Sequence, residues 1–380
     1  MKSPRNYLFG DIMDMLLLVL LPSFILPWVC KAIWPHQITW KELAINIPVG
    51  LVVGMIVYAI GAYTQVMDVE IINGEVLSKT RVHDSYVRSY SCRCRQTCSG
   101  SGNNRTCTQT CDTCYEDRYT VTWKSHTNVG DYTIDHKDSG SRSVYKSDDP
   151  AFYTNVKVGD PVAARHSFVN YVKAAPSSLF HQHDSKSSTF ANMIPEYPAD
   201  VYNFYSLNRA LTVNVPVPDI QQWNHDISIL LKKLGPQRQA NVIVLFVNTP
   251  DQAYIHALEG KWIGGKKNDI IVVIGTTSYP KIDWVAISSW TDEQMFKVKL
   301  RDDIMALANI DRQSVMAAID QNTMSLFKRK SMKDFEYLKH RAEPPIWVLT
   351  LAIVLSIITS IGCSFYFYKN DPFGNNRRYR

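Results

Sequence analysis

The stretch Cys92–Cys114 reads CRCRQTCSGSGNNRTCTQTCDTC and contains six of the eight cysteines in the 380-residue chain. Its cysteines are placed almost symmetrically about a central Ser-Gly-Ser-Gly-Asn-Asn turn. Cys98 and Cys107 have the same midpoint in the sequence as Cys94 and Cys111, between Gly102 and Asn103 of this turn. Residues that face each other on the two strands of an antiparallel hairpin have this spacing. The stretch therefore predicts a β-hairpin that carries its cysteines in opposed pairs.

The remaining pair, Cys92 and Cys114, is one residue out of step with the other two. A β-bulge between Cys111 and Cys114 would bring it into line. Opposed side chains in a hairpin are close enough for disulfide bonds. The predicted bonds are Cys98 with Cys107, Cys94 with Cys111, and Cys92 with Cys114. A zinc site is the alternative, because the stretch contains a CxxC and a CxC pair, but these pairs are unequal and two cysteines would be left over.

Three segments of the chain are apolar and long enough to cross a bilayer, which takes about 20 residues of helix. They lie at about residues 12–30, 43–67 and 344–368. Acidic residues precede the first segment and no small-residue cleavage pattern follows it, which argues against a cleavable signal peptide. We therefore predict three transmembrane helices, two within residues 1–67 and one within 344–380, where a basic tail follows it.

The second of these segments carries two glycines, Gly50 and Gly54, at GxxxG spacing. Small residues at this spacing form a face on which a second helix can pack closely. The pattern predicts either a tight hairpin of the first two helices or a homo-oligomer formed through transmembrane helices.

The distribution of Lys and Arg predicts the orientation in the membrane. The short loop at 31–42 and the carboxyl tail carry more of them than the amino-terminal segment, which favours a multi-pass protein of the cell membrane with a cytoplasmic tail. The large domain between the spans is then periplasmic or extracellular, where disulfides form. One basic run, in the juxtamembrane segment 326–343, opposes this orientation. Its members are Lys328, Arg329, Lys330, Lys333, Lys339 and Arg341.

The net charge of +6 is concentrated in the juxtamembrane run and the tail, as is typical of proteins that contact a membrane surface. The chain contains no nucleic-acid recognition motif and no basic stripe interleaved with aromatic residues. We therefore expect the lipid bilayer to be a partner and exclude nucleic acid.

The domain between the spans changes in composition near residue 215. Residues 68–215 are rich in Val, Tyr, Thr and Ser with short alternating runs, which predicts a β-rich domain with the cysteine hairpin at 88–120. Strands are expected there at 69–72, 119–123 and 156–158. Residues 216–325 alternate helical and strand patterns, which predicts an α/β sandwich. The whole chain is then an α+β membrane protein.

The second domain has clear boundary signals. A helix from Ile220 is expected to end at Gly235-Pro236, and buried strands are expected at 241–247, 270–274 and 284–287. Thr249 and Pro250 have the arrangement of a helix start, and Thr291 and Gln294 have the spacing of a capping box. The last helical region includes Ile304 and Ile319.

Residues 216–322 resemble the TPM domain, an α/β module of bacterial envelope proteins and a plant thylakoid phosphatase. The similarity rests on a buried strand, a helix, Trp262-Ile263-Gly264, a basic loop, Asn268 and a second buried strand. The resemblance implies a membrane-tethered module outside the cytoplasm. In the family the loop before the second strand commonly reads Asp-Asn-Gly, and its acidic residues are linked to calcium and phosphatase activity. This chain has Lys267, Asn268 and Asp269, so a lysine replaces a hard oxygen ligand.

Other candidate sites are weaker. His181 and His183 could bind a metal together with a third ligand, although an exposed polar loop explains them more simply. No nucleophile stands out, because the chain lacks a Gly-x-Ser-x-Gly elbow. We therefore expect no catalytic residue and no cofactor, with calcium at Asn268 and Asp269 as the exception that the family resemblance implies.

These observations favour a membrane-anchored interaction or scaffold protein of the cell envelope without catalytic activity. Its hairpin tip, held rigid by the adjacent crosslinks, is the expected contact surface for a protein partner, because preorganisation lowers the ordering cost of binding. The tip residues are Ser99, Gly100, Ser101, Gly102, Asn103 and Asn104. The texture of the chain also resembles membrane proteins of tailed bacteriophages and their hosts. The alternative function is a metal-dependent phosphatase that uses the TPM-like domain.

Overall fold

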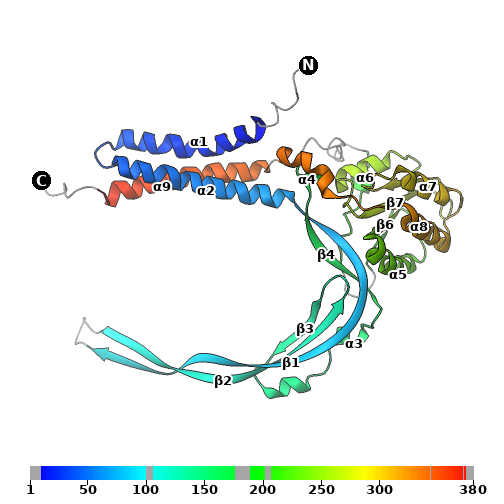
Figure 1. The fold of residues 1–380 in the computed structure, drawn as a ribbon, viewed down its shortest axis with the longest axis horizontal. Helices are drawn as coiled ribbons and strands as arrows, with labels where there is room; N and C mark the ends of the chain where they lie inside the picture. Colours follow the sequence, from blue (N-terminus) through cyan, green and yellow to red (C-terminus); the bar gives the residue numbers. More distant parts are fainter. Residues whose placement is uncertain are drawn as a thin grey trace.

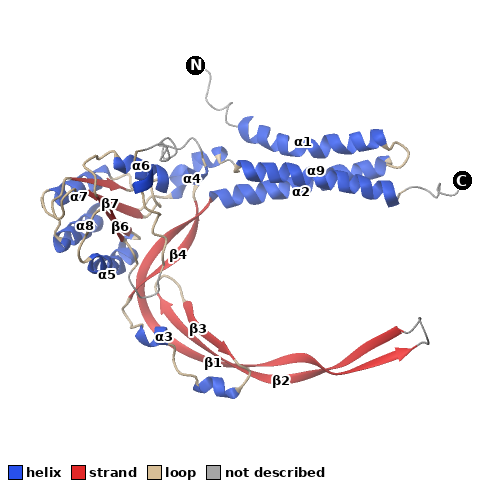
Figure 2. Ribbon diagram, turned by 180° about the vertical axis from the view of Figure 1, so that it is seen from behind, coloured by secondary structure: helices blue, strands red, loops and turns tan. Residues whose placement is uncertain are grey.

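The computed structural model of the chain describes residues 10–99, 106–175, 189–201, 207–342, 344–370 and 372–373. It has a mixed α+β fold, as predicted, with a helical bundle, an α/β domain and a long two-stranded β arm (Figure 1). The arm curves away from the α/β domain, and the far ends of its two strands lie on the same side of the molecule as the loop between α1 and α2 (Figures 1 and 2).

Three long helices form the bundle: α1 (Gly10–Ile33), α2 (Trp40–Val66) and α9 (Ile346–Asn370). Over the described residues, α2 and α9 are the helices long and apolar enough to cross a membrane. The apolar part of α1 that is described with its side chains, Leu17–Ile33, is shorter. A capping box starts α2, because Thr39 and Glu42 each accept a hydrogen bond from the other's backbone N–H.

The glycine face of α2 is filled by the other two helices of the same chain. A Cβ added to Gly50 would lie 2.7 Å from the Ser23 hydroxyl on α1 and 2.9 Å from the Ser360 hydroxyl on α9. A Cβ on Gly54 would lie 2.7 Å from the hydroxyl of Ser356. The glycines therefore allow close packing within one chain, and a homo-oligomer would have to use a different helix face.

The arm begins where α2 ends. β1 (Met67–Ser99) pairs first with β4 (Pro161–Val169) and then, from Val76 onward, with β2 (Thr106–Thr127). β3 (Tyr132–Asp138) extends the other edge of β2, so the antiparallel sheet has the order β3-β2-β1-β4. The hairpin is thus a continuation of the two central strands of this sheet.

Two of the three strands expected in this half are confirmed and one is wrong. Residues 69–72 lie in β1 and residues 119–123 in β2, whereas 156–158 are a turn that follows α3 (Ala151–Asn155). This segment reads Val-Lys-Val, and an alternation of only three residues cannot distinguish a strand from a loop. Short helices complete this half of the chain: η2 (Arg142–Lys146), α4 (Tyr171–Ala174) and η4 (Ala191–Met193).

The α/β domain is built on a second four-stranded sheet with the order β5-β6-β7-β8. β5 (Ala210–Val213), β6 (Asn241–Val247) and β7 (Asp269–Gly275) are parallel, and β8 (Trp284–Ser288) is antiparallel to β7. All residues of β6 and β7 are buried, as their unbroken apolar runs predict. The sheet starts before the expected boundary at residue 215, because β5 is too short to show a periodic pattern.

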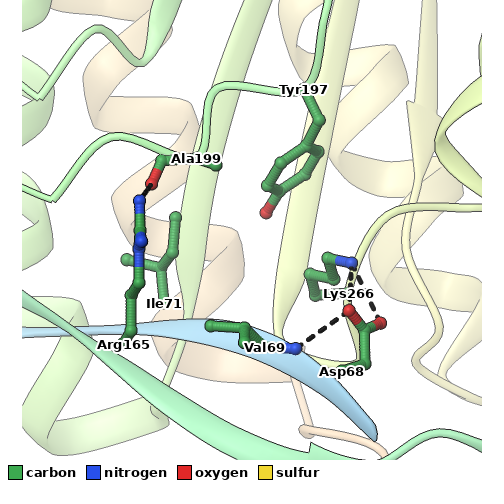
Figure 3. Close-up of a pocket in the computed structure, with 7 residues that line it drawn as sticks. All are labelled: Asp68, Val69, Ile71, Arg165, Tyr197, Ala199 and Lys266. Carbon is green, nitrogen blue, oxygen red and sulfur yellow. Dashed lines mark hydrogen bonds and ion pairs between the residues drawn. The ribbon is translucent and has the colours of Figure 1, made fainter. Parts of the chain in front are cut away.

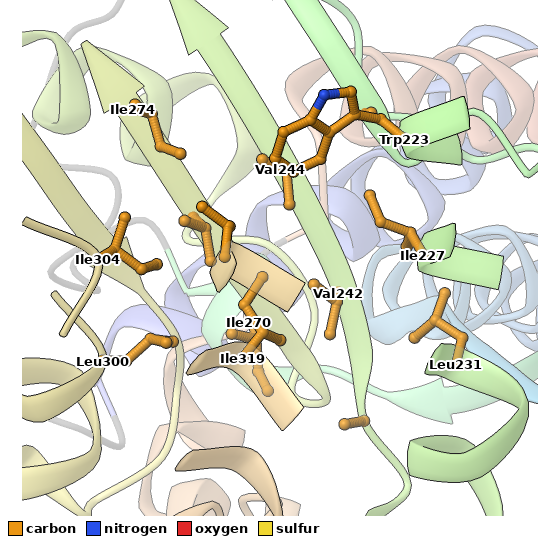
Figure 4. Packing of buried hydrophobic residues seen from close by; sticks show 14 of the residues in the cluster. Trp223, Ile227, Leu231, Val242, Val244, Ile270, Ile274, Leu300, Ile304 and Ile319 are labelled. Carbon is orange, nitrogen blue, oxygen red and sulfur yellow. The ribbon is translucent and has the colours of Figure 1, made fainter. Parts of the chain in front are cut away.

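Helices cover both faces of this sheet. α5 (Ile220–Arg238), α7 (Gln294–Met305) and α8 (Arg312–Leu326) pack on one face, and Figure 4 shows their apolar side chains against those of β6 and β7. α6 (Tyr254–Trp262) packs on the opposite face. The parallel strands β5, β6 and β7 are neighbours in chain order across the sheet, but the connecting helices α5 and α6 lie on opposite faces. The two crossovers therefore have opposite hands, and one of them departs from the usual right-handed rule.

Three helix boundaries differ from expectation. α5 continues through Pro236 to Arg238, because a proline in the last turn disturbs few backbone bonds. Gly235 instead meets β1: a Cβ there would lie 2.0 Å from the Asn73 carbonyl oxygen. The glycine therefore permits close contact between α5 and the base of the arm.

The other two differences concern helix starts. α6 begins at Tyr254, and the Thr249 hydroxyl accepts from Asp251 N in the preceding turn. α7 begins after Glu293 without a side-chain cap, so the expected capping box is wrong. In both places a threonine forms a local turn two residues long, which the sequence cannot distinguish from a cap.

Candidate functional site

The three disulfides at the end of the arm are those that the spacing predicts. Cys92 is bonded to Cys114, Cys94 to Cys111, and Cys98 to Cys107, with Cα atoms 5.8, 3.9 and 4.0 Å apart. All six thiols are used in these bonds, so the zinc alternative is wrong.

The bulge lies on the other strand from the one expected. The register shifts between Cys92 and Arg95 on β1, and Arg93 has the left-handed φ of 45° there. Cys92 consequently faces Asp112, and its disulfide with Cys114 runs diagonally across the ribbon. A disulfide can join diagonal neighbours as well as opposed ones, so the cysteine spacing does not determine which strand holds the extra residue.

The arm is braced near its base. Val121 and Trp123 are fully buried there, and Arg81 donates to Asp149 at 3.0 Å. The Tyr145 hydroxyl donates to the carbonyl oxygen of Asp84 at 3.1 Å. The last brace is Asp138 at the end of β3, which accepts from the Tyr86 hydroxyl at 2.6 Å and pairs with Arg118 at 3.7 Å. We call residues 85–99 and 106–118 the distal arm.

Both faces of the distal arm are exposed. The large side chains Val87 and Tyr115 are 62% and 71% exposed on one face, and Tyr86 and Tyr90 are 45% and 42% exposed on the other. Arg88, Arg93 and Arg95 lie on β1, as Tyr86 and Tyr90 do. Tyrosine and arginine are enriched at protein interfaces, where they supply large contacts at low entropic cost. Of the expected tip, Ser99 ends β1 and residues 100–104 lie outside the described residues.

A buried carboxylate holds the base of the arm to the rest of the molecule. Glu70 on β1 is fully buried and accepts from Arg329, which precedes the last helix. Its other partners are His166 Nδ1 on β4 at 2.8 Å and Lys267 Nζ before β7 at 3.3 Å. Burial alone would raise the pKa of Glu70, but the bond and charge of Arg329, with His166 and Lys267, hold that pKa below its usual value.

This junction joins four separate parts of the chain, and none of the sequence patterns predicted it. The only signal in the sequence was an acidic residue two positions after Asp68 in the start of β1, and nothing identified a partner as distant as Arg329. The same residue, Arg329, belongs to the basic run that we read as a membrane flank. Its structural role is to neutralise Glu70.

The two residues at the TPM-like loop are buried and bonded to protein groups. Asp269 Oδ1 accepts from Asn241 Nδ2 at 2.9 Å, and Oδ2 accepts from the Tyr197 hydroxyl at 2.8 Å and from Lys266 N at 2.7 Å. Burial raises the pKa of Asp269 in spite of these bonds. Asn268 is fully buried too, and its Nδ2 donates into the base of the arm. Both carboxylate oxygens of Asp269 are thus already engaged.

The segment 189–201 covers this loop and the face of α6. It is anchored mainly by side chains of the α/β domain: the fully buried Arg209 donates to the carbonyl oxygens of Pro198 at 2.8 Å and Asp200 at 2.7 Å. Trp262 Nε1 donates to the carbonyl oxygen of Pro195 at 3.0 Å. Sequence patterns do not reveal such a segment, because its only regular secondary structure is the three-residue helix η4.

Within the described ranges, no group of three or more His, Cys, Asp or Glu side chains is placed to hold a metal ion. The candidate ligands His181 and His183 lie outside those ranges. Comparisons of the chain with protein-family models, with curated proteins and with solved structures found no match.

Proposed function

We propose that this protein is a membrane-anchored interaction or scaffold protein of the cell envelope, without catalytic activity, that presents the distal arm to a protein partner. The observation that carries the proposal is the exposure of both faces of a long ribbon beyond Asp84. A two-stranded ribbon is marginally stable by itself, and this one is maintained by three crosslinks. Such a projection adds no buried core to the fold, so we expect that it serves to contact another molecule.

Aromatic residues near both ends of the bundle support membrane anchoring. Trp40 and Tyr63 on α2 are exposed, and so are Trp347 and Tyr366 on α9. At 1.5 Å per residue these pairs are about 34 and 29 Å apart, close to the roughly 30 Å thickness of the bilayer core. We include α1 as a third span, because it lies against α2 and α9.

The disulfides support a periplasmic or extracellular domain and a cytoplasmic tail. The basic run before the last span, which opposed this orientation, has partners within the domain. Lys328 pairs with Glu293 at 2.9 Å, Lys330 pairs with Asp292, and Arg329 pairs with Glu70. These three charges are explained by folding of the domain, so they do not require a cytoplasmic location.

A bilayer around the bundle restricts where the arm can point. In Figure 1 the distal arm curves back toward the side on which the bundle lies. Charged residues such as Arg88 and Glu116 are costly in hydrocarbon. We infer that the distal arm turns away from the bilayer, bending beyond its last brace, which Asp138 forms with Tyr86 and Arg118.

Thiol labelling tests the orientation. Intact cells that express the full chain are treated with a membrane-impermeant alkylating reagent before and after reduction, and labelled cysteines are identified by mass spectrometry. The six hairpin cysteines should be labelled only after reduction. Labelling that needs cell lysis but no reduction would contradict both the disulfides and the orientation.

Site-specific photocrosslinking tests the arm. A crosslinking residue at Thr97 on the distal arm should give a discrete product with an envelope protein in intact cells. The matched control places the same residue at Arg301, an exposed position on α7. Equal crosslinking at both positions, or none at Thr97, would contradict the proposal.

The phosphatase alternative is tested with Asp269→Asn in the purified full chain. Both oxygens of Asp269 accept hydrogen bonds, and an amide nitrogen cannot, so we expect a destabilisation of about 1 to 3 kcal/mol in chemical unfolding. We expect no turnover of phosphoesters by the wild-type chain with or without calcium. Turnover that Asp269→Asn abolishes would establish the alternative. The relation of residues 216–322 to the TPM domain is part of our proposal and rests on the element order of α5 to α8.

A further inference from the structure

The distal arm has two long open edges. β4 pairs with β1 only as far as Glu75, and β3 pairs with β2 no further toward the tip than Thr120. Along residues 85–99 and 106–118, no strand within the described ranges therefore occupies the outer edge of either strand. Each open edge exposes a row of backbone N–H and C=O groups, and long exposed edges are templates for pairing with another strand. A strand added there would extend the ribbon into a wider sheet.

The two strands of the distal arm carry opposite charge. The β1 strand contributes Arg88, Arg93 and Arg95 and no acidic residue. The β2 strand has a net charge of −2, and its charged residues are Asp112, Glu116, Asp117 and Arg118. Arg88 faces Glu116 within the ribbon, with Nη1 4.0 Å from Oε1, and both side chains are exposed. The basic edge of one arm is thus complementary to the acidic edge of another.

The base of the arm is fixed to the α/β domain, so every copy of the chain holds its arm in the same way. Lys266 Nζ donates to both carboxylate oxygens of Asp68 on β1, at 2.7 and 2.9 Å (Figure 3). Arg165 on β4 donates to the carbonyl oxygen of Ala199 at 3.2 Å (Figure 3). An edge that is held in place loses less entropy when it binds than a free peptide does.

Anchoring in one membrane decides which edges can meet. Copies that share a membrane are related by rotation about its normal, so their arms run in the same direction. Two β1 strands would then be parallel, and both would be basic. β1 of one copy and β2 of the next run antiparallel, as they do within a single ribbon. The copies also lie at the same depth, so Arg88 of one arm comes beside Glu116 of the next.

We propose that the distal arms of neighbouring copies pair edge to edge, with the basic β1 strand of one arm against the acidic β2 strand of the next. This inference rests on the function proposed above and deepens it, because it names a second copy of the chain as the partner of the arm. Each copy uses a different edge for each neighbour, so the contact is heterologous and assembly continues beyond the dimer until a ring closes. The assembly does not need the helix face at Gly50, which is filled within one chain.

Charge reversal in the purified full chain in detergent tests the proposal. Sedimentation velocity over a range of micromolar concentrations should show wild-type oligomers larger than dimers. Arg88→Glu or Glu116→Arg alone should raise the concentration needed for assembly about tenfold, because an attractive cross-strand pair becomes a repulsive one. The matched control is Arg301→Glu at an exposed position on α7, which should assemble as the wild type does.

A mixture of the two arm variants separates a contact between copies from an effect within one arm. Each variant has like charges at positions 88 and 116 inside its own ribbon, and mixing leaves those pairs in place. Where the two variants alternate, the contacts between copies at these positions join opposite charges again. The mixture should therefore assemble as the wild type does, and failure to recover would overturn the pairing.

Three other results would also overturn the inference: a wild-type chain that stays monomeric at the highest concentration, a strictly dimeric chain, or single reversals that assemble as the wild type does. Non-reducing intact mass and circular dichroism verify that each variant keeps its disulfides and fold. Photocrosslinking at Thr97 then separates this failure from that of the proposed function. A monomeric chain that crosslinks to a different protein removes only the self-pairing, and a monomeric chain without any product removes both.

Discussion

The α/β domain and the distal arm are both built around paired β-strands, yet different forces hold them. Every residue of β6 and β7 is buried, and the ring of Phe246 meets that of Trp223 with centroids 4.9 Å apart. In the distal arm Tyr115 is 71% exposed and the strands are joined by three disulfides. Backbone pairing is therefore shared, whereas the stabilising term is hydrophobic burial in one region and covalent crosslinking in the other.

The difference also separates stability from recognition. A strand buried on both faces cannot present side chains to a partner, while the exposed ribbon presents two faces along its whole length. The crosslinks replace the core that such a ribbon lacks. The charged junction at Glu70 then joins the exposed region to the packed one.

Truncation of the packed core should have the largest effect. Phe246→Ala removes a fully buried ring and should lower the free energy of unfolding of the α/β domain by about 3 to 5 kcal/mol. Tyr115→Ala on the distal arm should change it by no more than about 0.5 kcal/mol. Urea titration of the full chain in detergent, followed by tryptophan fluorescence, measures both. Similar losses for the two variants would break the comparison.

Reduction of the disulfides should act on the arm alone. Amide hydrogen exchange should become fast in the distal arm and stay slow in β6 and β7. Two single-disulfide variants can be compared: one keeps Cys92–Cys114, with a separation of 22 residues, and the other keeps Cys98–Cys107, with a separation of 9. The first bond closes the longer loop, so it should stabilise the folded arm by about 0.8 kcal/mol more than the second. Loss of protection in β7 on reduction would show that the two regions are coupled.

The junction between the two regions should be sensitive to acid. The pKa of Glu70 is held below its usual value of 4.5, so ionised Glu70 stabilises the fold above that pH, and this contribution is lost as the pH falls through the folded-state pKa. Glu70→Gln should cost about 2 kcal/mol at pH 7, and the difference from wild type should shrink below roughly pH 4. Unfolding measured across this pH range tests the effect. The control Glu116→Gln removes an exposed arm carboxylate and should change the free energy of unfolding at pH 7 by less than about 1 kcal/mol.

The parts of the fold that were predicted correctly depend on local patterns. The cysteine spacing in Cys92–Cys114 predicted all three disulfides, because a hairpin relates residues by their distance from one turn. Apolar runs predicted β6, β7 and β8, because strands buried on both faces of a sheet need unbroken apolar sequence. Longer apolar runs predicted the helices α2 and α9. The first strand of the α/β sheet, β5, lies before the boundary expected at residue 215, because a strand of four residues is too short to show an alternating pattern.

Features that depend on distant parts of the chain could not be predicted. Gly235 was expected to end a helix, but it lies against the backbone of Asn73. Asp269 was a candidate ligand, but segment 189–201 brings the Tyr197 hydroxyl onto its carboxylate. In both cases the residue type was noticed and its role was set by a partner that no spacing rule connects to it.

The sequence alone determined where strands cross-link, which strands are buried and which helices are apolar, because each of these follows from neighbours along the chain. The tertiary structure decided which strand carries the bulge, that the basic residues Lys328, Arg329 and Lys330 pair with acids of the domain, and that segment 189–201 covers Asp269. Glu70 and Arg329 are 259 residues apart, and a pair so distant is chosen by packing of whole elements rather than by local pattern.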